Sequence, residues 1–522
     1  MCAHRARCRA RIIESETTPV TAPADSTLTN HEIDAVASVA AAAAPLWATT
    51  HPAQRAAALV AAASALEQSK AELVRIAMEE TALSETRLVG ELNRTAVQLR
   101  LFAETILDGA YLDVRIDQLD PDFVLGPRPD VRRYLVALGP VVNFAASNFP
   151  FAFSVAGGDT VAALAAGCPV IVKAHSGHPR LSALTAKVVA TALEGAGAPA
   201  GTLQVIYGQA RGVAMLEHPS IKAGSFTGSI RAGRILSTVA ASRTVPIPFF
   251  GELGSVNPVF VTAAAIAERA DAIAEGFVTS VAGSAGQLCT KPGFLFVPSV
   301  QALAGMIAAA ASAAPEQRLL NPSIAEAYRA RRDAILGASG VSTVSEGSLR
   351  IDADGQGWAT PTIVSTAAAN LVRERGALLD EAFGPLSIVV EYSEANDLTE
   401  LAAQLFDGNL TGTVHLADNE NTPALGDLID WLTDHVGRVL FGGWPTGVAV
   451  TPAMQHGGPW PATSNDSSTS VGTAAISRFL RPVAYQNAPQ ARLPEPLRDD
   501  NPWGVPQSIS PAGESRSWGA RA

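Results

Sequence analysis

The chain has 522 residues, of which 48% are hydrophobic and 17% are charged, and its formal net charge is −11 at pH 7. That length exceeds the size at which one hydrophobic core keeps growing, so we expect two or three domains. The acidic balance argues against a nucleic-acid-binding protein and leaves small-molecule chemistry open.

The termini, the cysteines and the apolar segments bear on location. Four cysteines, at positions 2, 8, 168 and 289, show no paired spacing, as expected in a reducing compartment such as the cytoplasm. No CxxC or HExxH cluster occurs, so we expect no metal site. Charges interrupt the Ala-rich segments too often for a membrane span. Residues 1–30 carry arginines without an apolar run behind them, which predicts a disordered tail, or an upstream start assigned in error, rather than a signal peptide.

Helical spacing of apolar residues, as in Leu59, Ala63 and Leu66, predicts a helical segment over residues 31–110. Residues 111–138 change to a Pro-rich, charged pattern that favours extended chain, such as a projecting hairpin.

Short apolar strands then alternate with helices. The first series has predicted strands at 140–144, 169–173, 203–207 and 221–226, and helices at 154–166, 179–195, 211–217 and 230–241. The second has strands at 258–262 and 293–298, and helices at 264–282 and 301–314. This alternation predicts an α/β fold with two parallel sheets, which bind ligands at the carboxyl ends of their strands. Residues 479–485 suit an edge strand, and the chain beyond residue 490 is expected to be mostly irregular.

Cys289 lies in a run of small residues between a predicted helix and a predicted strand. A lone cysteine is most often a buried, inert one. It becomes a nucleophile when substrate can reach it and when nearby positive charge stabilises the thiolate. The glycines at 283 and 286 would allow that close approach.

Other segments carry side chains of a catalytic type, each with an ordinary structural alternative. Glu252, set among glycines where the two series meet, suits a general base, although most glutamates are solvated surface charges. Asn148, just before Phe-Pro at the end of a strand, suits an oxyanion donor or a loop residue.

Cofactor-type residues follow two other predicted strands. Thr227, Gly228 and Ser229 open a helix and suit either a pyrophosphate site or an N-cap. Lys173 ends a strand and suits either nucleotide contact or a lysine that extends to water. The usual GxGxxG fingerprint is absent here.

In order along the chain stand Asn-Phe-Pro at 148–150, the strand-end lysine at 173, Phe-Thr-Gly-Ser at 226–229, Glu-Leu-Gly at 252–254, Gly-Gln-Leu-Cys at 286–289 and Glu-Ala-Phe-Gly-Pro at 381–385. With these motifs, the chain resembles the aldehyde dehydrogenase superfamily over roughly residues 30 to 490.

The resemblance implies a role for each matching residue. Cys289 is then the nucleophile, Glu252 the general base, and Asn148 with the Cys289 backbone N–H the oxyanion site. The residues that match cofactor-binding positions are Lys173, Thr227, Gly228, Ser229, Glu381 and Phe383.

It also implies a division of the chain. Residues 31–110 and 139–252 form an NAD(P)-binding domain, 253–475 a catalytic domain, and 111–138 with 476–490 an oligomerisation flap, with mostly irregular chain over 491–522. We therefore expect a homodimer or homotetramer.

The cofactor preference is expected to lean towards NADP, with NAD also possible. Ser176 stands where many NAD-preferring members have a glutamate that grips the ribose, so repulsion of a 2′-phosphate is absent. Arg211, after the next strand, would supply the positive partner.

The carboxyl-terminal His-Gly-Gly-Pro-Trp-Pro-Ala-Thr segment at 456–463 resembles a subgroup containing 2-oxoglutarate-semialdehyde (2,5-dioxopentanoate) dehydrogenases and an NADP-dependent fatty-aldehyde dehydrogenase. That subgroup favours the semialdehyde as substrate. Phe149, Phe151 and Trp460 would instead form an apolar tunnel for a longer aldehyde. His456 would either face the thiol or serve as a structural hydrogen-bonding group.

Two other classes stay open. An acyl-thioester reductase would not need Glu252, and a non-catalytic scaffold would have no reason to keep Cys289, Glu252 and Asn148 together.

Overall fold

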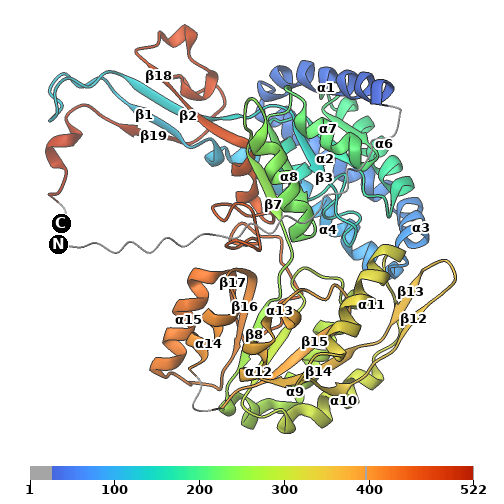
Figure 1. Ribbon diagram of the computed structural model, residues 1–522. Coiled ribbons are helices and arrows are strands. Elements are labelled where there is room, and N and C mark those ends of the chain that lie inside the picture. Colours follow the sequence, from blue (N-terminus) through green and yellow to red (C-terminus); the bar gives the residue numbers. More distant parts are fainter. Residues whose placement is uncertain (1–25, 394–396, 521–522) are drawn as a thin grey trace, which may run out of the picture.

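The computed structural model describes residues 26–393 and 397–520, and consists of two α/β lobes with a sheet that projects from one of them (Figure 1). Of the tail predicted over residues 1–30, residues 1–25 lie outside the described chain, and residues 26–30 are helical rather than disordered because α1 begins at Ser26.

Helices fill the amino-terminal segment, as its apolar spacing predicts. They are α1 (Ser26–Ala48), α2 (Pro52–Gln68), α3 (Lys70–Thr81) and α4 (Glu85–Asp108). Pro52 lies in the first turn of α2, where its missing N–H costs nothing. Apolar residues of α2 and α4, among them Leu59 and Leu99, are fully buried in one core with the first sheet. The helical segment is thus part of the first lobe.

The first sheet is parallel throughout, with the strand order β5-β4-β3-β6-β7. Its strands are β3 (Val141–Phe144), β4 (Val170–Lys173), β5 (Leu203–Ile206), β6 (Ala223–Thr227) and β7 (Phe249–Glu252), and its helices are α5 (Asp159–Ala166), α6 (Pro179–Gly195), α7 (Gln209–Glu217) and α8 (Ile230–Ser242). The chain order reverses between β3 and β6, so a ligand crevice is expected at their carboxyl ends.

One predicted helix in this lobe is shorter than its pattern suggested. The helix expected from residue 154 begins only at Asp159. A side chain at Gly157 would lie 2.3 Å from the carbonyl oxygen of Ala152, and Gly158 has a φ of +55°. This tight turn requires glycine and keeps the preceding residues out of the helix.

The second sheet has the order β11-β14-β15-β9-β8-β16-β17, and only the β11–β14 pair is antiparallel. Its strands are β8 (Pro258–Val261), β9 (Phe294–Val297), β11 (Ser342–Ser345), β14 (Thr362–Ala367), β15 (Leu386–Glu391), β16 (Asn409–His415) and β17 (Val436–Phe441). Its helices are α9 (Ala263–Ala282), α10 (Gln301–Ala313), α11 (Pro322–Leu336), α12 (Ala368–Arg373), α13 (Arg375–Leu378), α14 (Leu398–Leu405) and α15 (Pro423–His435). A small separate sheet joins β10 (Gln317–Arg318), β13 (Gly357–Ala359) and β12 (Leu349–Ile351).

Both faces of the second sheet are covered. Phe294 and Phe296 of β9 enter one hydrophobic core, whereas Leu295 and Val297 enter the core on the other face. This alternation is the expected period of two along a strand, and it explains why the strand is apolar at every position.

The projecting sheet, here called the flap, has the order β18-β2-β1-β19. Its strands are β1 (Val114–Asp117), β2 (Val131–Ala137), β18 (Leu480–Gln486) and β19 (Gln507–Ser510). The predicted pairing of the extended segment with the tail strand occurs between β2 and β18.

The tail beyond residue 490 has more order than predicted, because β19 pairs with β1 in parallel. The sequence pattern is Pro-rich and irregular there, but Leu493, Leu497 and Val505 pack with Val114 and Ile116 into a small core.

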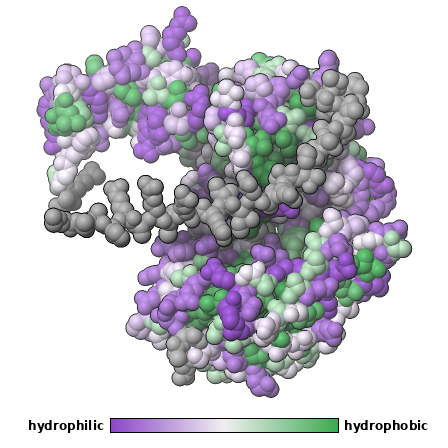
Figure 2. Space-filling model, in the orientation of Figure 1, coloured by the Kyte–Doolittle hydropathy of each residue, from purple (hydrophilic) through white to green (hydrophobic). Residues whose placement is uncertain are grey.

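Within the described residues, no helix is both long and apolar enough to cross a bilayer. On the face in Figure 2, apolar side chains gather over α8, beside the hollow between the two lobes. Ile235 of this helix is 54% exposed.

Candidate active site

Cys289 follows α9 and a short turn, η2 (Gly283–Gly286), in which Ser284 and Ala285 have φ values of +53° and +54°. Left-handed backbone costs a non-glycine residue about 1–2 kcal/mol, and such strain is often found at functional sites. The Gln317 side chain helps to fix the turn, because it accepts from the Ala285 N–H and donates to the Ala282 carbonyl oxygen. The loop that carries the thiol is therefore held in a costly conformation by specific bonds.

Glu252 ends β7 and is 2% exposed. The Ser470 hydroxyl donates to its Oε2, and its Oε1 lies 2.5 Å from His456 Nε2. Burial alone would raise the pKa of Glu252, but the charge of His456 and the hydrogen bonds from His456 and Ser470 lower it below its ordinary value. A buried carboxylate is thus kept ionised beside the thiol loop.

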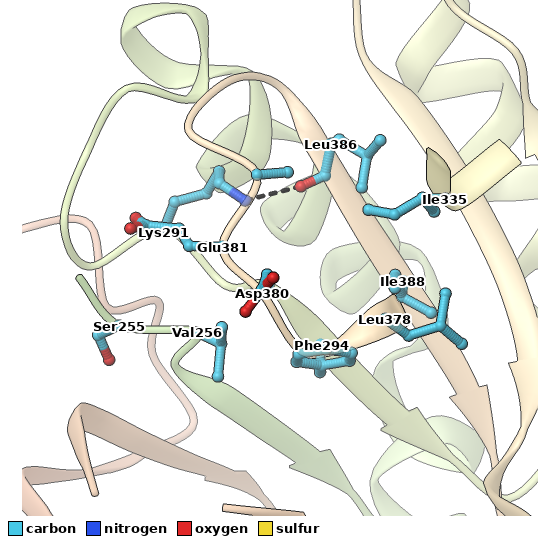
Figure 3. A pocket seen from close by; sticks show the side chains of 12 residues that line it. Ser255, Val256, Lys291, Phe294, Ile335, Leu378, Asp380, Glu381, Leu386 and Ile388 are labelled. Atoms are coloured by element: carbon cyan, nitrogen blue, oxygen red, sulfur yellow. Dashed lines mark hydrogen bonds between the residues drawn. The ribbon is translucent and has the colours of Figure 1, made fainter. Parts of the chain in front are cut away.

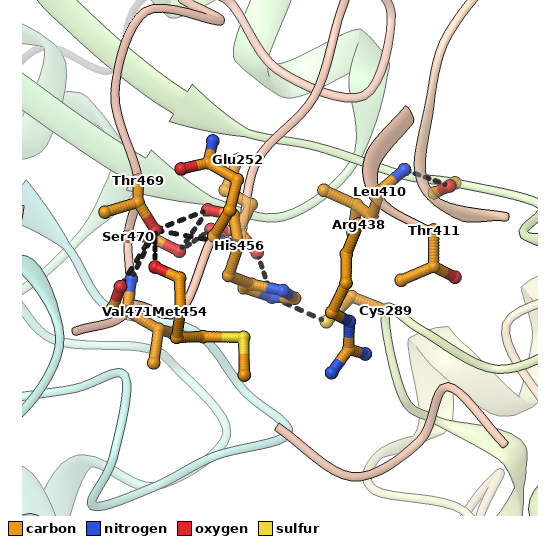
Figure 4. Close-up of polar contacts among 12 residues, drawn as sticks. Glu252, Cys289, Leu410, Thr411, Arg438, Met454, His456, Thr469, Ser470 and Val471 are labelled. Atoms are coloured by element: carbon orange, nitrogen blue, oxygen red, sulfur yellow. Dashed lines mark hydrogen bonds and ion pairs between the residues drawn. The ribbon is translucent and has the colours of Figure 1, made fainter. Parts of the chain in front are cut away.

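His456 links the carboxylate to the thiol (Figure 4). Its Nε2 is 3.6 Å from Cys289 Sγ, and its ring is 1% exposed. Burial alone would lower the pKa of His456, but Glu252 and Cys289 outweigh it and raise the pKa to about 10. The imidazole is therefore cationic at neutral pH, and a cation beside a cysteine favours its thiolate.

Two N–H groups near the thiol are available to a developing oxyanion. Asn148 Nδ2 donates one hydrogen bond, 3.0 Å long, to the Gln287 carbonyl oxygen. An amide nitrogen has a second N–H, and both Asn148 and Cys289 line the same cavity. The backbone N–H of Cys289 has no hydrogen-bond acceptor within the described part of the chain.

That cavity has a volume of about 440 Å³ and extends from Cys289 to the start of α8 and the end of β4. It opens at the carboxyl ends of β3 and β6, where the strand order reverses. Ser229 caps α8, its hydroxyl accepting from the Ala232 N–H, and the free amides of such a helix start attract phosphate. Val213 and Ile235 add apolar walls. A phosphate site and an apolar slot in one cavity fit a dinucleotide.

Comparisons with known proteins agree with this geometry. Residues 15–452 match the family model described as the aldehyde dehydrogenase family. The chain belongs to the aldehyde dehydrogenase family. It is therefore an oxidoreductase that acts on aldehydes with a pyridine nucleotide, as the sequence motifs predicted.

Two relatives match nearly the whole aldehyde dehydrogenase chain. The alpha-ketoglutaric semialdehyde dehydrogenase of Acinetobacter baylyi is 41% identical over 93% of this chain and 92% of its own. Alpha-ketoglutaric semialdehyde dehydrogenase 2 of Azospirillum brasilense is also 41% identical, over 94% of this chain and 93% of its own.

The fold is also that of solved structures. A 1-pyrroline-5-carboxylate dehydrogenase from Thermus with bound NAD has a TM-score of 0.73 at 22% identity, covering 87% of this chain and 85% of that one. This likeness confirms the predicted α/β fold.

Most of the cofactor residues predicted for this aldehyde dehydrogenase line the cavity: Lys173, Thr227, Gly228, Ser229, Glu381 and Phe383. Two predicted residues do not. Ser176 is exposed beyond the end of β4. Arg211 of α7 forms an ion pair with Glu32 of α1, 2.7 Å long, and is not among the cavity-lining residues.

Glu381 also faces Lys291, beside a small cavity of about 10 Å³ with room for about one water molecule (Figure 3). Lys291 Nζ donates to the Leu386 carbonyl oxygen at 2.6 Å. Burial lowers the pKa of Lys291 and raises the pKa of Glu381, and the attraction between them opposes both shifts. A side chain at Gly254 would lie 2.5 Å from Glu381 Oε2, so glycine there lets the carboxylate approach.

Of the four predicted substrate residues, only His456 contacts the thiol. His456 is at the thiol, but Phe151 is 1% exposed in the hydrophobic core and Trp460 is 44% exposed beside Arg234. Phe149 lies under the guanidinium of Arg87, 4.9 Å from its ring centre. Phe149 packs against Phe153, whose ring lies against His456. Phe151 and Trp460 lie elsewhere, and none of the three predicted aromatic residues is among those that line the cavity at Cys289.

Several residues near the thiol carried no signal in the sequence. Ser470 holds Glu252. Arg94 of α4 lies over the Phe153 ring, and its charge interacts with Cys289 and Glu252. Arg438 of β17 interacts with the charge of Cys289, while its Nη atoms donate to the carbonyl oxygens of Gly447 and Pro445. Only the fold brings these distant segments together.

The metal prediction concerns the same cluster. Within the described residues, the ligand atoms of Glu252, Cys289 and His456 lie within 4.8 Å of one another and are of metal-binding type. That no metal takes part remains a prediction.

Proposed function

We propose that this aldehyde dehydrogenase oxidises 2,5-dioxopentanoate (2-oxoglutarate semialdehyde) to 2-oxoglutarate through a thioester on Cys289. The observation that carries the chemistry is the Cys289–His456–Glu252 contact, with distances of 3.6 Å and 2.5 Å, at the end of the dinucleotide-sized cavity. The two relatives named for this semialdehyde support the substrate.

The first step is attack of the Cys289 thiolate on the aldehyde carbon, which forms a C–S bond and leaves negative charge on the former carbonyl oxygen. The second N–H of Asn148 and the backbone N–H of Cys289 stabilise that oxyanion. A pyridine nucleotide, when bound in the cavity lined by Lys173, Ser229 and Glu381, would supply the hydride acceptor. Loss of hydride from the adduct leaves a thioester on Cys289.

Hydrolysis of the thioester then needs a base. Glu252 takes a proton from water, the hydroxide attacks the thioester carbon, and the C–S bond breaks to release the acid and the thiolate. Both carboxylate oxygens are engaged in the resting site, by Ser470 and by His456. His456 and Ser470 lower the pKa of Glu252 and so weaken it as a base, and we therefore expect hydrolysis to be slow relative to acylation.

Arg94 is our candidate for binding the distal carboxylate of the semialdehyde. It is half-buried and near Cys289, and its guanidinium has no hydrogen-bonding or ion-pair partner within the described residues. A charge-assisted bond is worth about 1.5–3 kcal/mol. The Arg94→Met variant is therefore expected to lower kcat/KM for 2,5-dioxopentanoate by about 10- to 150-fold.

The matched control is Arg100→Met, because Arg100 is on the same helix but forms a surface ion pair with Glu67. Steady-state rates with 2,5-dioxopentanoate and decanal, in both variants, test the assignment. A wild-type preference for decanal would reject the semialdehyde in favour of a fatty aldehyde. A product other than the free acid would favour an acyl-thioester reductase.

We further propose a preference for NADP over NAD. Lys173 lines the cavity, and Ser176, exposed just beyond the end of β4, carries no charge. The positive partner of a 2′-phosphate is then Lys173 rather than the ion-paired Arg211. Ser176→Glu is expected to raise the NAD-to-NADP ratio of kcat/KM by about tenfold through repulsion. Ser176→Gln is the control of similar size, and an equal shift in both variants would contradict the electrostatic argument.

Assembly and location are proposals too. The open edge of β18 favours a homodimer or homotetramer, which light scattering would test. The free thiols of Cys168 and Cys289 fit the reducing environment of the cytoplasm.

A further inference from the structure

Another cavity, of about 370 Å³, lies where the first lobe meets the flap and the carboxyl-terminal tail. It is lined by residues of α2, of β2 and of the tail segment that includes η5 (Glu495–Leu497). It shares no lining residue with the cavity at Cys289. Three separate parts of the chain must therefore dock to form it.

Arg55 of α2 lines this cavity and is 2% exposed. Within the described residues its guanidinium makes one hydrogen bond, from Nη2 to the Tyr111 hydroxyl at 2.6 Å. A guanidinium has five N–H donors, and the buried Nε of Arg55 is among those without a partner. No carboxylate of the described chain lies within ion-pair distance of it.

An unpaired buried cation is costly, since desolvation is not offset by an opposite charge. The surroundings nevertheless accommodate it. Gly167 has a φ of +94°, and a side chain there would lie 2.8 Å from Arg55 Nη1. Glycine at 167 thus makes room for the guanidinium itself, which lines the cavity and has donors without a partner in the described chain, as expected if an anion completes the site.

The remaining walls suggest what kind of anion fits. Arg498 adds a second positive charge, and within the described residues its side chain makes one hydrogen bond, from Nε to the Leu493 carbonyl oxygen. Glu495 is the one carboxylate among the lining residues, and it accepts from the Trp503 indole. Tyr134 and Trp503 present aromatic surface. The lining therefore combines a net positive charge with flat apolar walls.

We propose that this cavity binds a small organic carboxylate, with its anionic group on Arg55 and its carbon skeleton against Tyr134 and Trp503. This site is independent of the chemistry proposed for Cys289. Because the cavity exists only when the tail is docked, such a ligand stabilises the folded protein by binding it preferentially.

The test uses the full-length protein, with benzoate, succinate and inorganic phosphate as separate probes. Calorimetry and thermal unfolding are followed for the wild type, Arg55→Met and Arg100→Met. We expect saturable binding of benzoate or succinate, a rise in Tm with ligand, and an affinity loss of about tenfold or more in Arg55→Met alone. In Arg94→Met, at the thiol, the component of benzoate binding that depends on Arg55 is expected to persist.

A readout without ligand separates a binding role from a structural one. Removal of an unpaired buried charge in Arg55→Met should leave the Tm of the ligand-free protein unchanged or higher. A lower Tm in the ligand-free variant, with no ligand dependence in the wild type, would mean that Arg55 is structural and would overturn the proposal.

Two half-buried positions keep the test informative if Arg55→Met does not fold. Arg498→Met and Trp503→Ala are expected to weaken benzoate binding severalfold. Phosphate binding that matches that of the carboxylates and ignores Trp503→Ala would overturn the organic ligand class. Absence of saturable binding by all three probes would overturn the site itself.

Discussion

Cys168 and Cys289 are both preceded by small or apolar residues, yet their surroundings differ. Cys168 follows α5, is fully buried in the core of the first lobe, and has its Sγ 3.5 Å from the Phe479 carbonyl oxygen. Burial raises the pKa of this thiol to about 11. Cys289 is half-buried, lines a large cavity and has a cationic imidazole 3.6 Å away. Access and a nearby positive charge, not the local sequence, therefore distinguish the thiol that we propose as the nucleophile from the buried one.

The largest expected effect comes from removing each thiol in turn. Cys289→Ala should lower kcat at least about 10⁴-fold, because no other group can form the thioester. Cys168→Ala should retain activity within about twofold, since its thiol reaches neither the cavity nor a base. Aldehyde-dependent reduction of the nucleotide measures both. Loss of activity in a folded Cys168→Ala protein would invalidate the comparison.

A smaller loss of turnover is expected from removing the Glu252 carboxylate, since within the described residues a carboxylate lies near Cys289 but none lies near Cys168. Glu252→Gln keeps the shape of the side chain but removes the base, so turnover should fall by about 10²- to 10⁴-fold while acylation continues. Rapid quenching and mass spectrometry should then show an acyl group on Cys289. If acylation slowed as much as turnover, Glu252 would be acting before the thioester forms.

The mildest change concerns His456. In His456→Asn the cation beside the thiol is lost, so alkylation of Cys289 by iodoacetamide at neutral pH should slow by about tenfold, and Cys168 should stay unmodified in both proteins. Peptide mapping over time measures both thiols. Equal rates for Cys289 in wild type and variant would show that the 3.6 Å contact does not activate it.

The same variant tests the ion pair through pH. The pKa of His456 is raised from 6.5 to about 10 in the folded protein. The ion pair of His456 with Glu252 therefore contributes its full stabilisation of the folded state below pH 6.5, and progressively less as the pH rises towards 10. The stability advantage of the wild type over His456→Asn should shrink over that range in urea unfolding. A constant difference would contradict the raised pKa.

Sequence patterns predicted the regular elements well, because apolar periodicity is a local signal. The helix over 179–195 has the predicted bounds, and β9 and α9 differ from theirs by a residue at each end or less. The sequence patterns failed to predict local structure where contacts between distant parts of the chain determine it. The turn before Asp159 depends on the close approach of Gly157 to Ala152, and β19 depends on packing against β1.

The site shows the same division. Cys289, Glu252 and Asn148 carry recognisable motifs, and the structure places them together. Arg211 had a suitable charge and position in the sequence, but Glu32, far along the chain, pairs with it. Arg94 and Ser470 have no local signal, because their role depends only on which side chains the fold sets beside them.

The parallel pairing of β19 with β1 changes which strand lies at one edge of the flap. Without it that edge would be β1, and with it the sheet ends in β19, while β18 stays the outer strand on the other side. β19 has four residues and β18 has seven, and a short edge strand offers little backbone for a further strand to pair with. The carboxyl-terminal tail thereby leaves β18 as the longer open edge, the one on which the assembly that we propose would depend.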